Sequence, residues 1–239
     1  MKIEGKHVVI TGGTDGIGLK IARLCASKGA NVIVCGRRAE LLKAAQAMGF
    51  EAISADLSNP SGCSAFAETL SERTIDILIN NAGMGGNFGP GEPLDLALTD
   101  QAIFLNLNAP MHLIGLLLPK LQQRPEAAIV NVTSGLAIAP RAGSPVYCAA
   151  KAGLRSFTQS LRHNLKGSNI RVIEALPPVV DTAMTAARAG KKMSPMQCAA
   201  QIVAAIENGK SEANIGIVKI LQAVYSLSPK LARAVMIRF

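Results

Sequence analysis

The chain has 239 residues, of which 49% are hydrophobic, and this is enough to bury a large core in a single α/β domain. Its net charge of +9 does not by itself indicate a nucleic-acid-binding protein, because aromatic residues are scarce and the Lys and Arg residues form no dense cluster. We therefore expect no nucleic-acid partner, and a multiply charged anionic cofactor would explain part of the basicity.

The cysteines, histidines and apolar segments exclude further classes of protein. The five cysteines include no C-x-x-C pair, which indicates free thiols in a reducing compartment, and the three histidines lack metal-ligand spacing, so no metal is expected. No run of 18 apolar residues occurs, and residues 1–10 lack the long apolar stretch of a signal peptide. These features predict a soluble, cytoplasmic protein.

Short apolar runs rich in β-branched residues recur along the chain, and helical patterns separate nearly all of them. This alternation predicts a single-domain, Rossmann-type, doubly wound parallel sheet of about seven strands with helices on both faces, connected by right-handed crossovers. The domain spans residues 1–239 and includes a C-terminal helical extension over about residues 219–239. The expected strands lie at about residues 7–11, 31–35, 51–55, 76–80, 128–133, 170–175 and 214–218.

The first expected strand ends in a glycine-rich turn that leads into a helical pattern. The turn contains Gly12, Gly16 and Gly18. Glycines at this place allow a tight turn and let backbone N–H groups approach a pyrophosphate, so the turn predicts a bound dinucleotide. Because the spacing differs from the standard dinucleotide fingerprint, a plain strand-to-helix turn is an alternative.

The end of the second expected strand carries Arg37 and Arg38, where an NAD-binding protein would place an acidic residue for the ribose 2′-hydroxyl. The planar guanidinium matches the geometry of a 2′-phosphate, so the pair favours NADP(H) over NAD. Asp15 in the glycine turn mildly favours NAD instead. The alternative is that both arginines only cap the strand and solvate the next helix.

Tyr147 and Lys151 lie four residues apart in a predicted helix and therefore share one face of it. A free phenol has a pKa of about 10, and a nearby cation stabilises its ionised form and lowers that value. We expect Lys151 to do this, so that Tyr147 acts as a proton donor. A solvated pair of the same spacing arises in many helices by chance, so the prediction depends on the upstream motifs.

Taken together, these motifs resemble the short-chain dehydrogenase/reductase family from about residue 6 to about residue 216. The matching segments are TGGTDGIG at 11–18, Asp56 with Leu57, NNAG at 80–83, Asn106, Ser134 and YCAAK at 147–151. The resemblance implies that catalysis is shared by Asn106, Ser134, Tyr147 and Lys151. Asn108 is a near neighbour, but the segment LNLNAPMHL matches the family's Asn-x-x-x-Pro helix with Asn106 leading.

The resemblance also implies the cofactor contacts and a homodimer or homotetramer. The family normally has Pro-Gly after the sixth strand, whereas this chain has Pro177 and Pro178, and the second proline should stiffen the floor beneath the nicotinamide. An alternative role for NNAG is a turn that stabilises the end of a strand. The implied cofactor contacts are Gly12, Thr14, Asp15, Gly16, Ile17, Gly18, Arg37, Arg38, Asp56, Leu57, Asn81, Ala82, Gly83, Tyr147, Lys151, Pro177, Val180 and Thr182.

Two segments near the C-terminus carry open alternatives. Residues 181–195 form either a substrate lid or a solvated loop whose Arg188, Lys191 and Lys192 are solubilising charge. The tail after residue 219 carries an apolar stripe at Leu231, Val235 and Phe239 beside Lys230, Arg233 and Arg238. That stripe is suited to an acidic membrane surface, to a partner subunit or to docking on the protein's own body.

The predicted function is NADP(H)-dependent interconversion of a small carbonyl compound and an alcohol by hydride transfer, with Tyr147 as general acid and base. The alternative function is a non-catalytic dinucleotide-binding regulator or scaffold that acts through the basic tail. The complete set of Asn106, Ser134, Tyr147 and Lys151 favours the enzyme.

Overall fold

The computed structural model describes residues 1–85 and 93–238. Seven parallel strands form one sheet in the order β3-β2-β1-β4-β5-β6-β7, which confirms the predicted doubly wound fold. The strand order reverses between β1 and β4, and ligands of such sheets bind beyond the carboxyl ends of the strands at that switch point. The strands are β1 (His7–Thr11), β2 (Asn31–Gly36), β3 (Glu51–Ser54), β4 (Ile77–Asn80), β5 (Ala127–Val132), β6 (Ile170–Leu176) and β7 (Glu212–Asn214).

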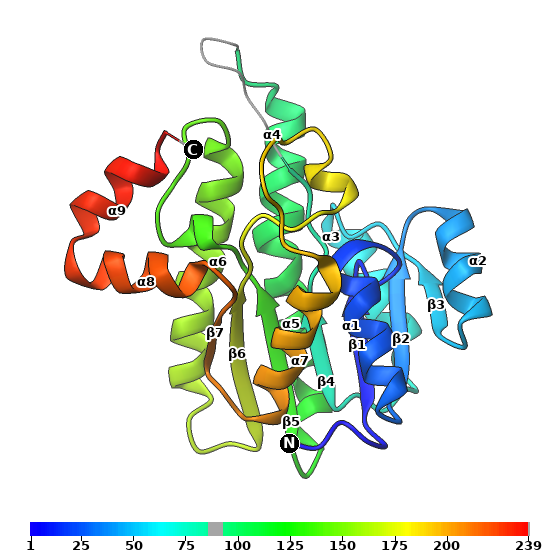
Figure 1. Cartoon of the computed structure of the whole chain (residues 1–239). Coiled ribbons are helices and arrows are strands. Elements are labelled where there is room, and N and C mark those ends of the chain that lie inside the picture. The colour runs from blue at the N-terminus through cyan, green and yellow to red at the C-terminus, as the bar shows by residue number, and fades with distance from the viewer. Residues whose placement is uncertain (86–92, 239) are drawn as a thin grey trace.

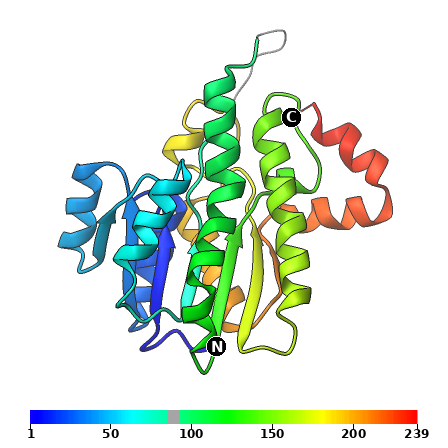
Figure 2. The same cartoon turned by 180° about the vertical axis from the view of Figure 1, so that it is seen from behind.

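Helices cover both faces of this sheet. α1 and α7 lie in front of it in Figure 1, and α3, α5 and α6 cover the face that is turned toward the viewer in Figure 2. Short π or 3-10 segments lie at Phe104–Asn108 (η1), Gly135–Ala137 (η2) and Ala183–Thr185 (η3). The α-helices are α1 (Gly16–Ser27), α2 (Ala39–Ala47), α3 (Pro60–Thr69), α4 (Leu96–Ile103), α5 (Ala109–Gln122), α6 (Pro145–Asn164), α7 (Pro195–Glu207), α8 (Val218–Leu227) and α9 (Pro229–Met236).

Alternate residues of the strands pack into the two helical layers. On β1, Val8 and Ile10 join the core that includes Ile21 of α1. Val9, between them, joins the opposite core with Leu113 of α5. Because both faces are covered, the central strands are mostly apolar instead of alternating with polar residues, and this pattern made them visible in the sequence.

The last strand lies earlier than the sequence predicted. We expected it at about residues 214–218, but β7 covers Glu212–Asn214, and α8 already begins at Val218. Gly216 turns the chain between them with a φ of +55°, a conformation that favours glycine. Ile215 and Val218 are both buried, so the apolar pattern of this segment reflects burial of a turn and a helix start, and the predicted position was wrong.

The longest helical segment is the continuous run of α4, η1 and α5 from Leu96 to Gln122, which is long and apolar enough to cross a membrane by length and composition alone. Leu113, Leu117 and Leu121 of α5 are buried in the core against the sheet and α3. Burial in the core explains part of the apolar character of the segment, of which 44% is buried.

The chain ends in an arm formed by α8 and α9, which projects sideways from the body (Figure 1, Figure 2). Ser228 ends α8 and caps α9, because its hydroxyl accepts a hydrogen bond from the N–H of Leu231 at 3.3 Å. Among the described residues, the arm contacts the body where Val218, Leu221 and Tyr225 pack with Ile138 and Leu176, and where the oxygen of Ile237 accepts from the N–H of Ala142 at 3.2 Å. Phe239, the last residue of the predicted stripe, lies outside the described residues.

Candidate active site

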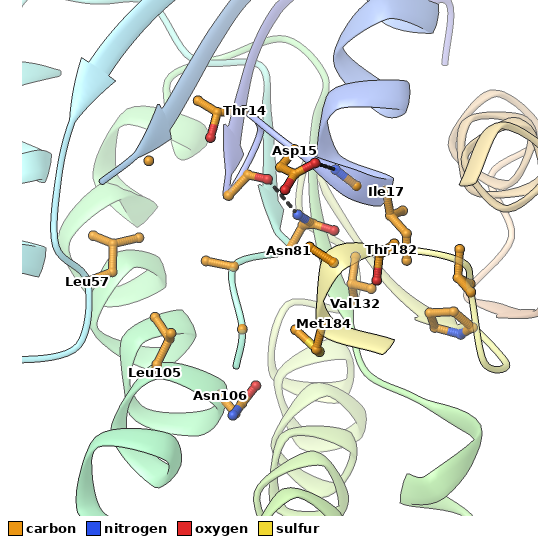
Figure 3. Close-up of a pocket in the computed structure, with 18 of the residues that line it drawn as sticks. Thr14, Asp15, Ile17, Leu57, Asn81, Leu105, Asn106, Val132, Thr182 and Met184 are labelled. Atoms are coloured by element: carbon orange, nitrogen blue, oxygen red, sulfur yellow. Dashed lines mark hydrogen bonds between the residues drawn. The ribbon is translucent and has the colours of Figure 1, made fainter. Parts of the chain in front are cut away.

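A cavity of about 380 Å³ opens beyond the carboxyl ends of the central strands. Its walls come from the turns that follow β1, β2, β4, β5 and β6 and from α6, as the topology predicts for such a sheet. In Figure 3, Thr14, Asp15 and Ile17 of the glycine turn lie on one side of this space, and Leu105, Asn106 and Met184 lie on the other. The predicted site residues that line it are Gly12, Thr14, Asp15, Gly16, Ile17, Arg37, Arg38, Asp56, Leu57, Asn81, Ala82, Gly83, Asn106, Ser134, Tyr147, Lys151, Pro177, Val180 and Thr182.

The glycine turn depends on backbone conformations that other residues avoid. Gly12 and Gly16 have φ of +61° and +53°, and a Cβ on Gly12 would lie 2.9 Å from the Cα of Ala82. Asp15 caps α1, because its Oδ1 accepts from the N–H of Gly16 at 2.7 Å. The turn therefore holds the first N–H groups of α1 toward the cavity, which is the arrangement that binds phosphate.

Gly18 is the one predicted contact that does not line the cavity. A Cβ there would lie 2.3 Å from the oxygen of Gly12 and 2.5 Å from Nδ2 of Asn81. Gly18 thus serves the close packing of α1 against the turn, and its contact with the cofactor stays a prediction.

The two arginines after β2 each face a carboxylate at the outer end of the cavity. Arg38 Nη2 lies 2.6 Å from Asp15 Oδ2, and Arg37 Nη1 lies 3.8 Å from Asp56 Oδ1. All four side chains are about half exposed, so these pairs contribute little to stability. Both guanidiniums therefore remain available to a further anion in the cavity.

Asn81 links the end of β4 to the glycine turn. Its Nδ2 donates to the oxygens of Thr11 and Gly12 at 3.0 and 3.2 Å, and the hydroxyl of Thr11 accepts from the N–H groups of Asn81 and Ala82, each at 3.0 Å. The bond to the turn is visible in Figure 3. The NNAG segment therefore stabilises the strand end and also lines the cavity, so its two predicted roles coexist.

Ser134, Tyr147 and Lys151 meet at the inner end of the cavity. Ser134 follows β5, and its hydroxyl accepts from the N–H of Leu136 at 3.1 Å. Lys151 lies one turn after Tyr147 on α6, with Nζ 5.7 Å from the centroid of the phenol ring. Lys151 is 4% exposed, and its Nζ donates to the oxygen of Val132 at 2.9 Å, which fixes α6 against the end of β5.

The pKa values of Tyr147 and Lys151 depend on burial and on nearby charges. Burial raises the pKa of Tyr147, whereas the Ser134 hydroxyl and the charge of Arg188 lower it. Burial also lowers the pKa of Lys151 to about 8. We expected Lys151 to lower the phenol pKa. In the structure its ammonium donates to Val132 and is itself desolvated, and Arg188 is a second cation, whose charge lowers that pKa.

Asn106 lies in the π-helical segment η1, where the helix bulges beside the cavity. Its Nδ2 donates to the oxygens of Met84 and Ala102 at 2.8 and 2.9 Å, and its buried Oδ1 has no partner among the described residues. A Cβ on Gly83 would lie 2.7 Å from that oxygen and 3.7 Å from Nζ of Lys151. Asn108, the alternative candidate, lies away from this cavity in a shallow depression on the outer face of α5.

The segment after β6 closes the cavity from the other side. The oxygen of Pro177 accepts from the N–H of Gly135 at 2.9 Å, and Val180 forms a parallel bridge with Met193. In the same segment, Lys192 donates to the oxygen of Thr185 at 2.7 Å, and only 14% of the Lys192 side chain is exposed. Lys192 therefore holds η3 in place, and the alternative that it is only solubilising charge was wrong.

Sequence reasoning missed several residues of the cavity wall. Because they have no characteristic chemistry, only their place directly after strands or inside the 181–195 segment could have indicated them. They are Cys35, Gly36, Ala55, Leu105, Val132, Thr133, Ala183, Met184 and Thr185.

The doubly wound sheet, the glycine turn and the group around Tyr147 together define a nucleotide-binding oxidoreductase. The family model for short chain dehydrogenase matches residues 6–192, and the chain belongs to this family. An uncharacterized oxidoreductase, DltE of Bacillus subtilis (strain 168), is 43% identical over 190 residues, which cover 77% of this chain and 75% of that protein.

Solved structures of other bacterial proteins share the fold. A short chain dehydrogenase from Burkholderia cenocepacia J2315 in complex with NADP has a TM-score of 0.88 at 24% identity and covers 99% of both chains. A short chain dehydrogenase/reductase from Burkholderia phymatum in complex with NAD has a TM-score of 0.82 at 22% identity and covers 95% of this chain and 96% of that chain. At these identities the likeness shows the fold alone.

Proposed function

We propose that this chain is an NADP(H)-dependent oxidoreductase that interconverts a carbonyl compound and an alcohol, with Tyr147 as general acid and base. The observation that carries the proposal is one continuous cavity with a phosphate-binding turn at one end and Ser134, Tyr147 and Lys151 at the other. The buried Oδ1 of Asn106 beside Gly83, which has no hydrogen-bond partner in the described part of the chain, fits the presence of a bound polar molecule or water there.

A bound nicotinamide supplies or accepts the hydride. In the reductive direction Tyr147 donates its phenolic proton to the carbonyl oxygen, and the hydroxyl of Ser134 donates a hydrogen bond to the same oxygen. Lys151 holds the inner ribose with its ammonium and, together with Asn106, resupplies the proton to Tyr147. Arg188 stabilises the phenolate that remains, because its charge lowers the phenol pKa against the opposing effect of burial.

The preference for NADP(H) rests on Arg37 and Arg38. Their exposed contacts with Asp56 and Asp15 are weak enough for a 2′-phosphate to compete for both guanidiniums. The similar structures from Burkholderia carry NADP in one case and NAD in the other, so the arginines of this chain support the choice of cofactor more than the likeness does.

Consumption of NADPH across a panel of aldehydes, ketones and quinones tests the proposal. The variant Tyr147→Phe keeps the ring and removes the proton donor, so it should bind NADPH as the wild type does and lose about 10²- to 10⁴-fold in turnover. Undiminished turnover by this variant would show that another group donates the proton.

The competing function is a regulator or scaffold that binds the dinucleotide without using it. It predicts tight NADPH binding, no consumption with any member of the panel, and no effect of Tyr147→Phe. The convergence of Asn106, Ser134, Tyr147 and Lys151 on one cavity favours the enzyme, because a binding module has no use for a buried lysine beside a phenol.

Two further assignments belong to the same proposal. The outer faces of α5 and α6 lie side by side and include exposed residues such as His112 and Leu116, which supports a homodimer or homotetramer formed through these helices.

For the projecting arm we favour an acidic membrane surface over a subunit contact, because residues 217–239 contain Lys219, Lys230, Arg233 and Arg238 but no acid. Such an arm is compatible with a cytoplasmic protein.

A further inference from the structure

Two arginines, Arg141 and Arg188, meet at the start of α6 although they come from different loops. Arg188 Nη2 donates to the hydroxyl oxygen of Ser144 at 3.4 Å, and Ser144 is only 1% exposed. The guanidinium of Arg141 lies over Gly143, where an added Cβ would be 2.9 Å from its Nη2. Because Gly143 and Ser144 are adjacent, the two guanidiniums occupy one small region.

This region adjoins the reacting group. Ser144 caps α6 and Tyr147 lies three residues later, so the two are separated by about one turn, or about 4.5 Å along the helix axis. The backbone of Arg141 is also tied to this turn, because its N–H donates to the sulfur of Cys148 at 3.4 Å. The field of Arg188 reaches the phenol, where it acts against burial and lowers the pKa of Tyr147.

Neither arginine has a carboxylate partner among the residues that the structure describes. This differs from Arg124 and Arg155, which pair with the buried carboxylates of Asp76 and Glu174. Arg188 is partly buried. Burial has the largest effect on its pKa and lowers it, and the charge of Arg141 lowers it further, whereas Tyr147 and Cys148 raise it. Two like charges held together and partly desolvated are unfavourable unless an anion joins them.

We propose that Arg188 and Arg141 bind the carboxylate of the substrate while its carbonyl group lies at Tyr147 and Ser134. The inference rests on the proposed function and names its substrate class: short oxo acids and the corresponding hydroxy acids, with the anionic group about one helical turn from the reacting carbon. The fork of each guanidinium suits a planar carboxylate, and a neutral substrate would leave both charges unpaired.

Paired substrates test this assignment. Full-length wild type, Arg188→Met, Arg188→Lys and the exposed control Arg23→Met are assayed with NADPH on acetoacetate and levulinate, each beside its methyl ester. The wild type should have a higher kcat/KM for at least one acid than for its ester. Arg188→Met should lower this acid-to-ester ratio of kcat/KM roughly 10- to 100-fold. Arg188→Lys should retain part of the preference, and Arg23→Met all of it. A general loss of activity cancels in the ratio, so a purely structural role of Arg188 would not change it.

A binding measurement separates this proposal from the proposed function. Calorimetric titration of the NADP⁺-loaded wild type with levulinate, a combination in which no hydride can be transferred, should show binding that Arg188→Met weakens by a similar factor. If the esters are reduced as well as the acids and levulinate does not bind, the anion site is overturned while the proposed function stands. If no carbonyl compound is reduced, binding of levulinate that depends on Arg188 still supports the anion site, and absence of binding overturns it.

Discussion

The ammonium of Lys151 donates a hydrogen bond to the main-chain oxygen of Val132 at 2.9 Å, from a position that is 4% exposed. Burial lowers the pKa of this lysine from 10.5 to about 8. Between these values the unfolded chain binds more protons at this site than the folded chain does. The folded state is therefore penalised at and below pH 8, and this penalty disappears as the pH rises from about 8 to about 10.5.

The first prediction follows for the pH dependence of stability. Relative to Lys151→Met, the free energy of unfolding of the wild type should rise with pH by on the order of 2–4 kcal/mol between about pH 8 and pH 10.5. Chemical denaturation at a series of pH values measures this difference. The exposed Lys166→Met variant is the control. The difference between its free energy of unfolding and that of the wild type should not change with pH. A flat curve for Lys151→Met would mean that Lys151 stays fully charged in the folded protein.

The second prediction concerns the contact between Gly83 and Asn106. A Cβ at residue 83 would lie 2.7 Å from Oδ1 of Asn106, so Gly83→Ala should displace that side chain. We expect kcat/KM to fall by about 10- to 100-fold, since small displacements in an active site have effects of that size.

Gly85→Ala is the matched control for this test. It lies two residues further along the same segment, and among the described residues its added Cβ would meet only Cγ of Met184 at 3.7 Å, an ordinary contact. Steady-state kinetics of both variants decide the matter. Equal kinetics for the two variants would show that Asn106 does not need its present position.

The parts of the site that the sequence predicted are those that depend on local spacing. The glycine turn, NNAG and Ser134 each follow a strand directly, so the sheet topology brings them together once the strands are recognised. The position of β7 was wrong because burial of Ile215 and Val218 produces the same apolar pattern as a strand.

Other features depend on contacts that no local pattern encodes. Arg188 and Arg141 are distant in sequence and meet only because the segment after β6 folds back over the start of α6. The direction of the Lys151 ammonium toward Val132 is likewise decided by side-chain packing in the folded core. The spacing of Tyr147 and Lys151 correctly indicated that they share a face of α6, but it could not show which cation acts on the phenol.

The third prediction concerns the cofactor. Arg37→Ser should lower kcat/KM for NADPH by about 10-fold or more and leave the value for NADH nearly unchanged, because only NADPH has the 2′-phosphate. Asp15→Asn keeps an N-cap on α1 and removes the charge that engages Arg38, so it should improve the use of NADPH. Arg23→Ser, on the exposed face of α1, is the control for loss of a positive charge. Equal losses with both cofactors in Arg37→Ser would assign Arg37 to the shared part of the dinucleotide.

The fourth prediction concerns the arm of α8 and α9. Its exposed apolar side chains include Ile220, Leu227, Leu231 and Val235, which are 64%, 89%, 55% and 48% exposed. Together with the neighbouring cations they should bind vesicles that contain phosphatidylglycerol and not vesicles of phosphatidylcholine alone. The double variant Lys230→Glu with Arg238→Glu should abolish this binding, as should high salt, because both remove the electrostatic attraction.

Co-sedimentation with vesicles measures the binding, and Lys2→Glu with Lys166→Glu is the control of equal charge on the body of the protein. Light scattering of the same samples gives the oligomeric state. If the wild type ignores both kinds of vesicle, and Leu231→Ser with Val235→Ser converts an oligomer to a smaller species, then the arm serves a subunit interface instead. The two outcomes differ in salt dependence as well, because an interface held by apolar side chains persists at an ionic strength that screens exposed charges.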